Sequence, residues 1–238
     1  MRLLLISNST NAGEEYLAYP MEQIKLFLGA RKKSILFIPY AGITISFDDY
    51  AERVNQRFLQ IGHSISSIHT FKNLLKSIED ADAIVIGGGN TWQLLHLLQK
   101  HKLIEAIRDK ILTGTPYIGW SAGANLCCPT IRTTNDMPVI EPESFSSFNL
   151  IPFQINPHYL DANPAGHAGE TREDRIKEFI HVNRDIYVVG LREGTMLLLE
   201  NSSIQLIGER KARIFRYGKE TMELSSDNYL SFLLHEPI

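Results

Sequence analysis

An α/β fold with a doubly wound, mostly parallel sheet and helices on both faces is predicted by two features of this sequence. Short runs rich in Ile, Val, Leu and Phe alternate with stretches whose apolar residues recur at helical spacing. The short runs lack the polar alternation of half-exposed strands, which is typical of strands buried on both faces of a parallel sheet. Strands that alternate with helices build that class of sheet. The predicted parallel strands cover residues 2–7, 34–39, 64–69, 83–86 and 116–120.

Helices are predicted between these strands. Asn90 is a suitable N-cap for one of them, and Gly114 is a suitable end for the last. The apolar residues of each stretch fall on one helical face, as in Tyr50, Val54 and Phe58. The predicted helices cover residues 50–61, 74–78, 91–99 and 104–112.

The pattern changes after residue 129. Residues 130–148 are rich in Pro, Ser and Thr and predict loops, and residues 171–182 predict a helix with Ile176, Phe179 and Ile180 on its apolar face. Because no Pro-, Gly- or Ser-rich linker interrupts the chain, residues 1–238 are expected to form a single α/β domain. Short apolar runs between turn residues predict antiparallel strands that extend the same sheet, over 185–191, 195–200, 203–207 and 213–217.

The composition excludes several classes of protein. Of the 238 residues, 44% are hydrophobic and 21% charged, and a net charge of -3 spread along the chain argues against a nucleic-acid surface. No apolar run approaches the length of a membrane span, and residues 1–6 are typical of a strand, not of a signal peptide. The adjacent Cys127 and Cys128 do not suggest a disulfide framework. We therefore expect a cytoplasmic protein that binds no membrane, either a monomer or a small homo-oligomer.

The segment Gly119-Trp120-Ser121-Ala122-Gly123 follows an apolar strand and precedes small helix-forming residues. This context is typical of a nucleophile elbow, in which a strained strand-to-helix turn exposes a serine hydroxyl. The flanking glycines fit because such a turn leaves no room for Cβ atoms. A glycine-rich strand end with a surface serine is the alternative. Since Gly-x-Ser-x-Gly also occurs by chance, the strand–turn–helix context carries the prediction that Ser121 is a nucleophile.

A serine hydroxyl needs a neighbouring base, and His158 is the first candidate. It follows the apolar run 153–155 within Asn156-Pro157-His158-Tyr159, a location that suits a residue held at a strand end. His167, in a glycine-containing loop, is the second candidate. The other histidines fall on predicted helix faces, strand edges or the C-terminal tail, where solvent-exposed or partly packed side chains are the ordinary expectation.

The base needs a carboxylate to orient it, and two residues compete for that role. Asp136 would give the chain order Ser, Asp, His, whereas Glu193 follows a buried strand and precedes a glycine. Spacing alone does not decide between them, and either can be a loop cap or a solvated charge.

An oxyanion hole completes the predicted chemistry. The N–H of Ala122 is the first donor, and Gly88 or Gly89 is the second because a glycine backbone can approach a ligand closely. The same glycine loop can bind a phosphate. However, the dinucleotide-binding and P-loop patterns are both missing from it, so this alternative is disfavoured.

Five motifs, taken in order, resemble the peptidase E family of α-aspartyl dipeptidases, and the likeness runs from the first strand to about residue 200. They are Gly-Gly-Gly-Asn-Thr at 87–91, Gly-Trp-Ser-Ala-Gly-Ala-Asn at 119–125, Pro-Thr-Ile-Arg-Thr-Thr-Asn-Asp-Met-Pro at 129–138, Gln-Ile-Asn-Pro-His at 154–158 and Gly-Glu-Thr-Arg-Glu-Asp-Arg-Ile at 169–176.

The resemblance implies a fold like that of class I glutamine amidotransferases, with serine in place of their cysteine. It also implies small peptide substrates of the form Asp-Xaa, hydrolysed with no metal and no other cofactor. By the same resemblance Ser121 is the nucleophile and His158 the base, while Asp136 and Glu193 both match positions read as the third member.

Three other functions are alternatives to an α-aspartyl dipeptidase. The first is a cyanophycinase-like hydrolase of β-linked aspartyl peptides, although the chain length fits the short dipeptidase better. The second is a non-catalytic small-molecule binder on the same scaffold, which the set of Ser121, His158 and a carboxylate disfavours. The third is an ordinary α/β-hydrolase esterase, which is disfavoured because only His235 lies near the C-terminus.

Recognition of an N-terminal aspartate requires a cation for its carboxylate and an anion for its ammonium. Arg172 is the candidate cation, because a guanidinium binds a carboxylate as a planar fork, and Glu170 is the candidate anion. The same segment also has the pattern of a well-capped helix start, beginning at Thr171. Arg132 and Arg192 are the fallback cations.

Overall fold

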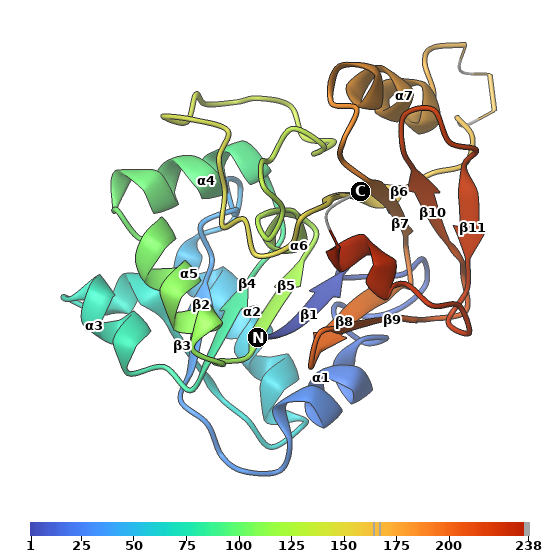
Figure 1. Cartoon of the computed structure of the whole chain (residues 1–238). Coiled ribbons are helices and arrows are strands. Elements are labelled where there is room, and N and C mark those ends of the chain that lie inside the picture. The colour runs from blue at the N-terminus through green and yellow to red at the C-terminus, as the bar shows by residue number, and fades with distance from the viewer. Residues whose placement is uncertain (164, 167, 236–238) are drawn as a thin grey trace.

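The computed structural model describes residues 1–163, 165–166 and 168–235, and a seven-stranded sheet lies at its centre (Figure 1). Five strands run parallel in the order β3-β2-β4-β5-β1, and β8 and β9 continue from β1 in antiparallel orientation. The predicted α/β class with C-terminal antiparallel strands is therefore confirmed. The strands are β1 (Arg2–Ile6), β2 (Ile35–Ile38), β3 (Ile65–Ser67), β4 (Ala83–Ile86), β5 (Tyr117–Trp120), β8 (Met196–Glu200) and β9 (Ser203–Ile207).

The parallel strands lie where the sequence predicts them. β4 matches its predicted range, and β1, β2 and β5 are slightly shorter. β3 ends early because the chain turns into the 3-10 helix η1 (Ile68–Thr70), in which the Thr70 hydroxyl donates to the Ser67 carbonyl at 2.8 Å.

Helices cover both faces of this sheet, because successive strand residues point to opposite sides. Leu3 and Leu5 pack into one apolar cluster, beneath α3 (Leu74–Glu79), α4 (Thr91–Lys100) and α5 (Ile104–Leu112). Leu4 and Ile6 pack into the other, beneath α1 (Met21–Leu28) and α2 (Phe47–Leu59).

Helix α1 is not among the predicted helices. Its N-cap position is occupied by Pro20, which offers no side-chain acceptor, so the start lacks the sequence signal of a capped helix. Met21, Ile24 and Phe27 are nevertheless buried against the sheet, and this packing stabilises the helix.

A second, four-stranded sheet corrects the prediction that all C-terminal strands extend the first one. Only β8 and β9 do so, whereas the second sheet has the order β11-β10-β7-β6 (Figure 1). The physical reason is the helix between β6 and β7. The strand–helix–strand crossover places β6 parallel to β7 on one edge, and β10 pairs antiparallel with the other, so β7 has no free edge for β8. The elements are β6 (Gln154–Tyr159), α7 (Arg172–Val182), β7 (Val188–Arg192), β10 (Ala212–Phe215) and β11 (Met222–Leu224).

The two sheets share a core. One face of the second sheet, including Ile155, Val189 and Leu191, packs into the same apolar cluster as α4 and α5. Its other face packs against Ile176 and Ile180 of α7. The short 3-10 helix η2 (Ser231–Leu234) adds Leu233 to the shared cluster.

Candidate active site

The Gly-Trp-Ser-Ala-Gly segment forms a tight turn between β5 and the short helix α6 (Ala122–Asn125). Ser121 stands at this turn with φ 52° and ψ -112°, a conformation that is strained for a non-glycine residue. A Cβ atom on Gly119 would lie 2.5 Å from the Gly123 carbonyl, and one on Gly123 would lie 2.3 Å from the Ile86 carbonyl oxygen. Both glycines are thus required by close backbone contact, as a nucleophile elbow demands.

His158 lies in a β-bulge near the end of β6. The register between β6 and β7 shifts between Pro157 and Tyr159, and His158 has φ 52°. A bulge changes the direction of a side chain, and here it brings His158 Nε2 to 3.0 Å from Ser121 Oγ. His167, the other candidate base, lies outside the described residues.

Glu193 follows the end of β7 and lies on the far side of His158. Its Oε1 is 2.8 Å from His158 Nδ1, so serine, histidine and glutamate form a hydrogen-bonded row. The side chains of His158 and Glu193 are 39% and 38% exposed. The row therefore borders solvent. In such a row a histidine can take the serine proton, while the carboxylate fixes the tautomer of the imidazole.

Asp136 has different partners. Its Oδ2 accepts from the Thr91 backbone N–H at 2.8 Å, from the Thr91 hydroxyl at 2.6 Å and from the Thr134 hydroxyl at 3.0 Å. These contacts place the carboxylate at the start of α4, where it satisfies a backbone donor of the first turn. Of the two candidate acids, the structure brings Glu193 and not Asp136 to the imidazole.

The predicted oxyanion residues lie beside Ser121. A Cβ atom on Gly88 would lie 3.0 Å from Ser121 Cβ. Gly89 has φ 133°, and a Cβ atom on it would clash with the Ala41 carbonyl oxygen at 2.3 Å. Within the described part of the chain, the N–H groups of Gly88, Gly89 and Ala122 donate to no protein acceptor. They are therefore available to a ligand oxygen, and their role as oxyanion donors stays a prediction.

A cavity of about 540 Å³ opens beside these groups. Ser121, His158, Gly88 and Gly89 line it together with Asp136. This volume is in the range of sites that hold small ligands, so the cavity is the candidate substrate site.

The peptidase family S51 profile matches residues 3–207, the part of the chain that carries all of these groups. The chain belongs to peptidase family S51. The peptidase E of Nostoc sp. is 53% identical over 233 residues, which cover 98% of this chain and 96% of that protein. The peptidase E of Shigella flexneri serotype 5b is 42% identical over 226 residues, which cover 95% and 98%. The predicted family and the prediction of a serine-type hydrolase are confirmed.

Two solved structures share the fold of this S51 peptidase. A putative peptidase E protein from Listeria monocytogenes has a TM-score of 0.65 at 22% identity, over 87% of this chain and 98% of that one. A peptidase from an acI-B1 actinobacterium has a TM-score of 0.70 at 20% identity, over 97% and 96%. At these identities the likeness concerns the fold alone.

The polar residues after β1 connect the two sheets of this S51 peptidase behind the row of Ser121, His158 and Glu193. The Ser7 hydroxyl accepts from the His158 backbone N–H at 3.0 Å and donates to the Leu191 carbonyl at 2.7 Å. Asn8 Oδ1 accepts from the Gly194 N–H at 2.9 Å, next to Glu193. Ser7 and Asn8 are not among the site residues predicted from the sequence. The available signal was their place directly after a buried strand, the same signal that selected Ser121.

The candidate substrate residues lie outside this cavity. Arg172 lines a neighbouring hollow of about 190 Å³ together with Arg132 and Asp136, and burial is the main cause that holds the pKa of Arg172 below its usual value. The Glu170 carboxylate lies 3.8 Å from Arg175 Nε. Among the described residues that line the cavity of Ser121, neither Arg172 nor Glu170 is present.

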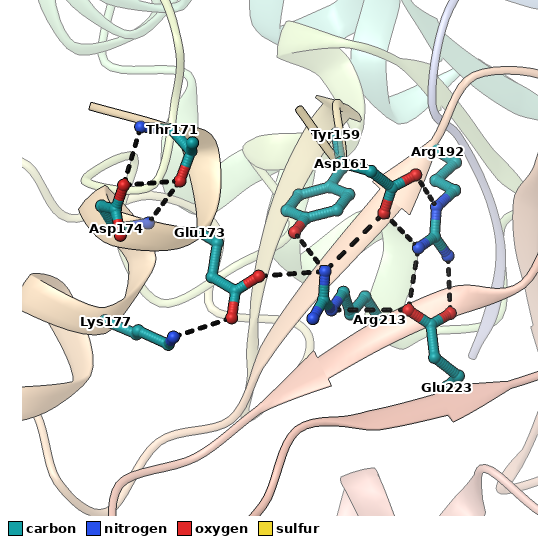
Figure 2. Close-up of polar contacts among 9 residues, drawn as sticks. All are labelled: Tyr159, Asp161, Thr171, Glu173, Asp174, Lys177, Arg192, Arg213 and Glu223. Atoms are coloured by element: carbon teal, nitrogen blue, oxygen red, sulfur yellow. Dashed lines mark hydrogen bonds and ion pairs between the residues drawn. The ribbon is translucent and has the colours of Figure 1, made fainter. Parts of the chain in front are cut away.

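Helix α7 begins with the predicted cap. Thr171 and Asp174 form a reciprocal capping box, with distances of 2.9 Å and 3.1 Å between backbone nitrogen and side-chain oxygen (Figure 2). The prediction that a capped helix starts at Thr171 is therefore confirmed. A binding role for Arg172 and Glu170 stays a prediction.

A charge cluster of five residues joins the ends of β6 and β7 to β10, β11 and α7 (Figure 2). Arg192 donates to both carboxylate oxygens of Glu223 at 2.8 Å and also pairs with Asp161. Arg213 pairs with Glu173 at 2.9 Å. Arg192 directly precedes Glu193, and Asp161 follows His158 by three positions. The cluster (Asp161, Glu173, Arg192, Arg213 and Glu223) thus links the two strand ends near His158 and Glu193.

The fallback cation Arg192 is therefore already paired with the carboxylates of Asp161 and Glu223.

The described residues offer neither a cluster of candidate metal ligands nor a membrane-spanning helix. They contain no group of three or more His, Cys, Asp or Glu side chains that could hold a metal ion. No helix among them is long and apolar enough to cross a membrane.

Proposed function

We propose that this S51 peptidase hydrolyses dipeptides with an N-terminal aspartate through an acyl-enzyme on Ser121. The observation that carries the proposal is the row in which His158 Nε2 lies 3.0 Å from Ser121 Oγ and His158 Nδ1 lies 2.8 Å from Glu193 Oε1. Both distances are those of direct hydrogen bonds, which proton transfer during catalysis requires.

In the proposed mechanism, His158 Nε2 takes the proton of Ser121 Oγ as the oxygen attacks the scissile carbonyl carbon. The carbonyl oxygen becomes an oxyanion that accepts from the N–H of Ala122 and from Gly88 or Gly89. His158 then donates its proton to the leaving amine, which frees the C-terminal residue and leaves an ester on Ser121. A water molecule that gives a proton to His158 hydrolyses this ester and restores the hydroxyl.

Glu193 serves as the orienting acid in this mechanism. It accepts a hydrogen bond from the Nδ1–H group, which leaves Nε2 of the neutral imidazole free to act as a base. The negative charge of the carboxylate also stabilises the imidazolium that forms during attack. Asp136 is assigned to the start of α4, where three donors already converge on one oxygen.

The specificity for aspartate is proposed from the peptidase E relatives, which match nearly the whole chain. Small peptides are the expected partners. Arg172 and Glu170 remain candidates for binding the substrate carboxylate and ammonium, and a cytoplasmic monomer or small homo-oligomer remains the prediction for the assembled protein.

A dipeptide panel with a labelling assay tests the proposed function. We expect cleavage of Asp-Leu, with much slower cleavage of Glu-Leu, Asn-Leu and β-Asp-Leu, and we expect a fluorophosphonate to label Ser121. Preferential cleavage of β-Asp-Leu would indicate a cyanophycinase-like specificity. Failure of the probe to label Ser121, together with no cleavage, would indicate a non-catalytic binder.

A further inference from the structure

The cavity beside Ser121 contains a guanidinium for which the proposed mechanism has no use. Arg53, on helix α2, lines this cavity, and it is the sole Lys or Arg that does so within the described part of the chain. Arg53 is exposed and makes no hydrogen bond or ion pair with any described residue, whereas Arg57, one turn later, pairs with Glu15 at 2.7 Å. The two arginines of one helix therefore differ: one is used by the protein, and the other faces the cavity with its charge uncompensated.

An aromatic ring holds Arg53 in place. Its guanidinium carbon lies 3.9 Å from the centre of the Tyr16 ring, within the range of a cation–π contact. Tyr16 in turn meets Trp120 edge to face at 6.4 Å, and Trp120 directly precedes Ser121. Because no described residue accepts a hydrogen bond from this guanidinium, its N–H groups remain free to form a fork with a carboxylate.

The aromatic residues next to Arg53 add hydroxyl groups and no negative charge. The Tyr16 hydroxyl donates to the Tyr50 hydroxyl at 3.4 Å, and Tyr50 donates to the Gly88 carbonyl at 2.9 Å. Burial raises the pKa of both phenols, so both are neutral at physiological pH. The acidic residue among the described lining residues is Asp136, which is bound to the start of α4.

We propose that Arg53 binds a carboxylate of the peptide substrate and so orients it over Ser121. The inference rests on the proposed function and adds a specificity-determining residue to it. A dipeptide backbone spans at most about 7 Å, so each of its carboxylates lies close to the scissile carbonyl. A cation that lines the same cavity can reach such a group, while Arg172 and Arg132 line the adjacent hollow. An Asp-Xaa dipeptide offers two such groups, the aspartyl side chain and the C-terminus.

The test compares Arg53→Met and Arg53→Lys with wild type on Asp-Leu. Arg53→Met should raise KM at least tenfold with kcat changed less than about threefold, because the lost contact acts mainly on binding. Arg53→Lys should lie between, since an ammonium keeps the charge but not the fork. Arg57→Met is the matched control: it removes a cation from the same helix outside the cavity and should leave both constants unchanged.

Two analogues identify the carboxylate. If Arg53 binds the C-terminus, Arg53→Met should cleave Asp-Leu and Asp-Leu-amide with equal kcat/KM. If Arg53 binds the aspartyl side chain, the variant should instead lose the preference for Asp-Leu over Asn-Leu. An unchanged KM on all three substrates would overturn the proposal.

A binding measurement separates this inference from the proposed function. Titration of the Ser121→Ala protein with uncleaved Asp-Leu, which carries both carboxylates, monitored by calorimetry, should show binding that an added Arg53→Met weakens at least tenfold and an added Arg57→Met does not. Equal binding by both variants overturns the role of Arg53 even if Asp-Leu is cleaved. Conversely, failure to cleave Asp-Leu would refute the proposed activity, while the titration would still decide whether Arg53 binds a carboxylate.

Discussion

The two halves of the candidate active site are built by different means. Ser121 lies in a turn where backbone packs directly on backbone, so that neither Gly119 nor Gly123 can carry a Cβ atom. His158 and Glu193 lie at the partly exposed ends of β6 and β7, and side chains distant in sequence fix them in place. Ser121 is thus positioned by backbone packed directly on backbone, and His158 and Glu193 by polar contacts with residues distant in sequence.

The difference extends to the arginines near each half. On the base side, Arg192 and Arg213 bind carboxylates of the protein and link strand ends. On the nucleophile side, Arg53 binds no described carboxylate and faces the cavity. A charge that is already paired serves the structure, whereas an uncompensated charge in a cavity is available to a ligand. The predictions below test this division of roles.

The largest effect is expected on the nucleophile side. Ser121→Ala should lower kcat by about 10⁴- to 10⁶-fold, as removal of a triad member does. Thermal stability should not fall, because the hydroxyl is replaced by a smaller group at a strained turn. Steady-state kinetics on Asp-Leu and a thermal melt provide the measurement. Retention of more than a few per cent of the activity would exclude Ser121 as the nucleophile.

The next effect should separate the two candidate acids on the base side. Glu193→Gln should lower kcat by roughly 10⁴-fold, because the amide can hold the imidazole in the wrong tautomer. Asp136→Asn should act mainly on stability or KM, since its contacts lie at the start of α4.

Both variants should be compared at one pH, with melting temperatures as a control for folding. A large loss of kcat in Asp136→Asn with little loss in Glu193→Gln would reverse the assignment. Small and equal losses would indicate that serine and histidine act as a dyad.

The smallest effect is expected from the charge cluster. Arg192→Met should destabilise the protein by about 1–2 kcal/mol, because it leaves Asp161 and Glu223 without their main partner near solvent. The kcat should fall less than about tenfold, since Ser7 still holds His158. Denaturant unfolding and kinetics measure the two effects, and Lys76→Met, in an exposed pair on α3, is the control that should change neither.

Acid unfolding sharpens this prediction. Hydrogen bonding from Arg192 lowers the pKa of the Asp161 carboxyl below its usual value. A carboxyl whose pKa is lower in the folded state adds stability above its unfolded pKa, about 4, and this stability is lost as the pH falls through the folded value. The stability difference between wild type and Arg192→Met should therefore shrink below about pH 4. A difference that stays constant would contradict the role given to this pair.

Sequence patterns predicted the parallel half of the fold and the turn at Ser121, and they put His158 first among the candidate bases. These predictions depend on residues close together in the chain. They are the buried strands, the capped helix starts at Asn90 and Thr171, and the Gly-x-Ser-x-Gly motif around Ser121. For the same reason the five motifs that resemble peptidase E could be recognised, and the match to family S51 confirms that expectation.

Which of the distant side chains meet is visible only in the three-dimensional fold. Asp136 and Glu193 both looked suitable, and only the crossover through α7 shows that the end of β7, with Glu193, lies beside His158. The same limit hid Ser7, 151 positions from the N–H that it binds, and Arg53, whose place in the cavity depends on Tyr16 and Trp120. Local patterns encode local backbone geometry, but hydrogen bonds and charges act over a few ångströms in space. Residues that act together across the chain become visible only once the fold has brought them into contact.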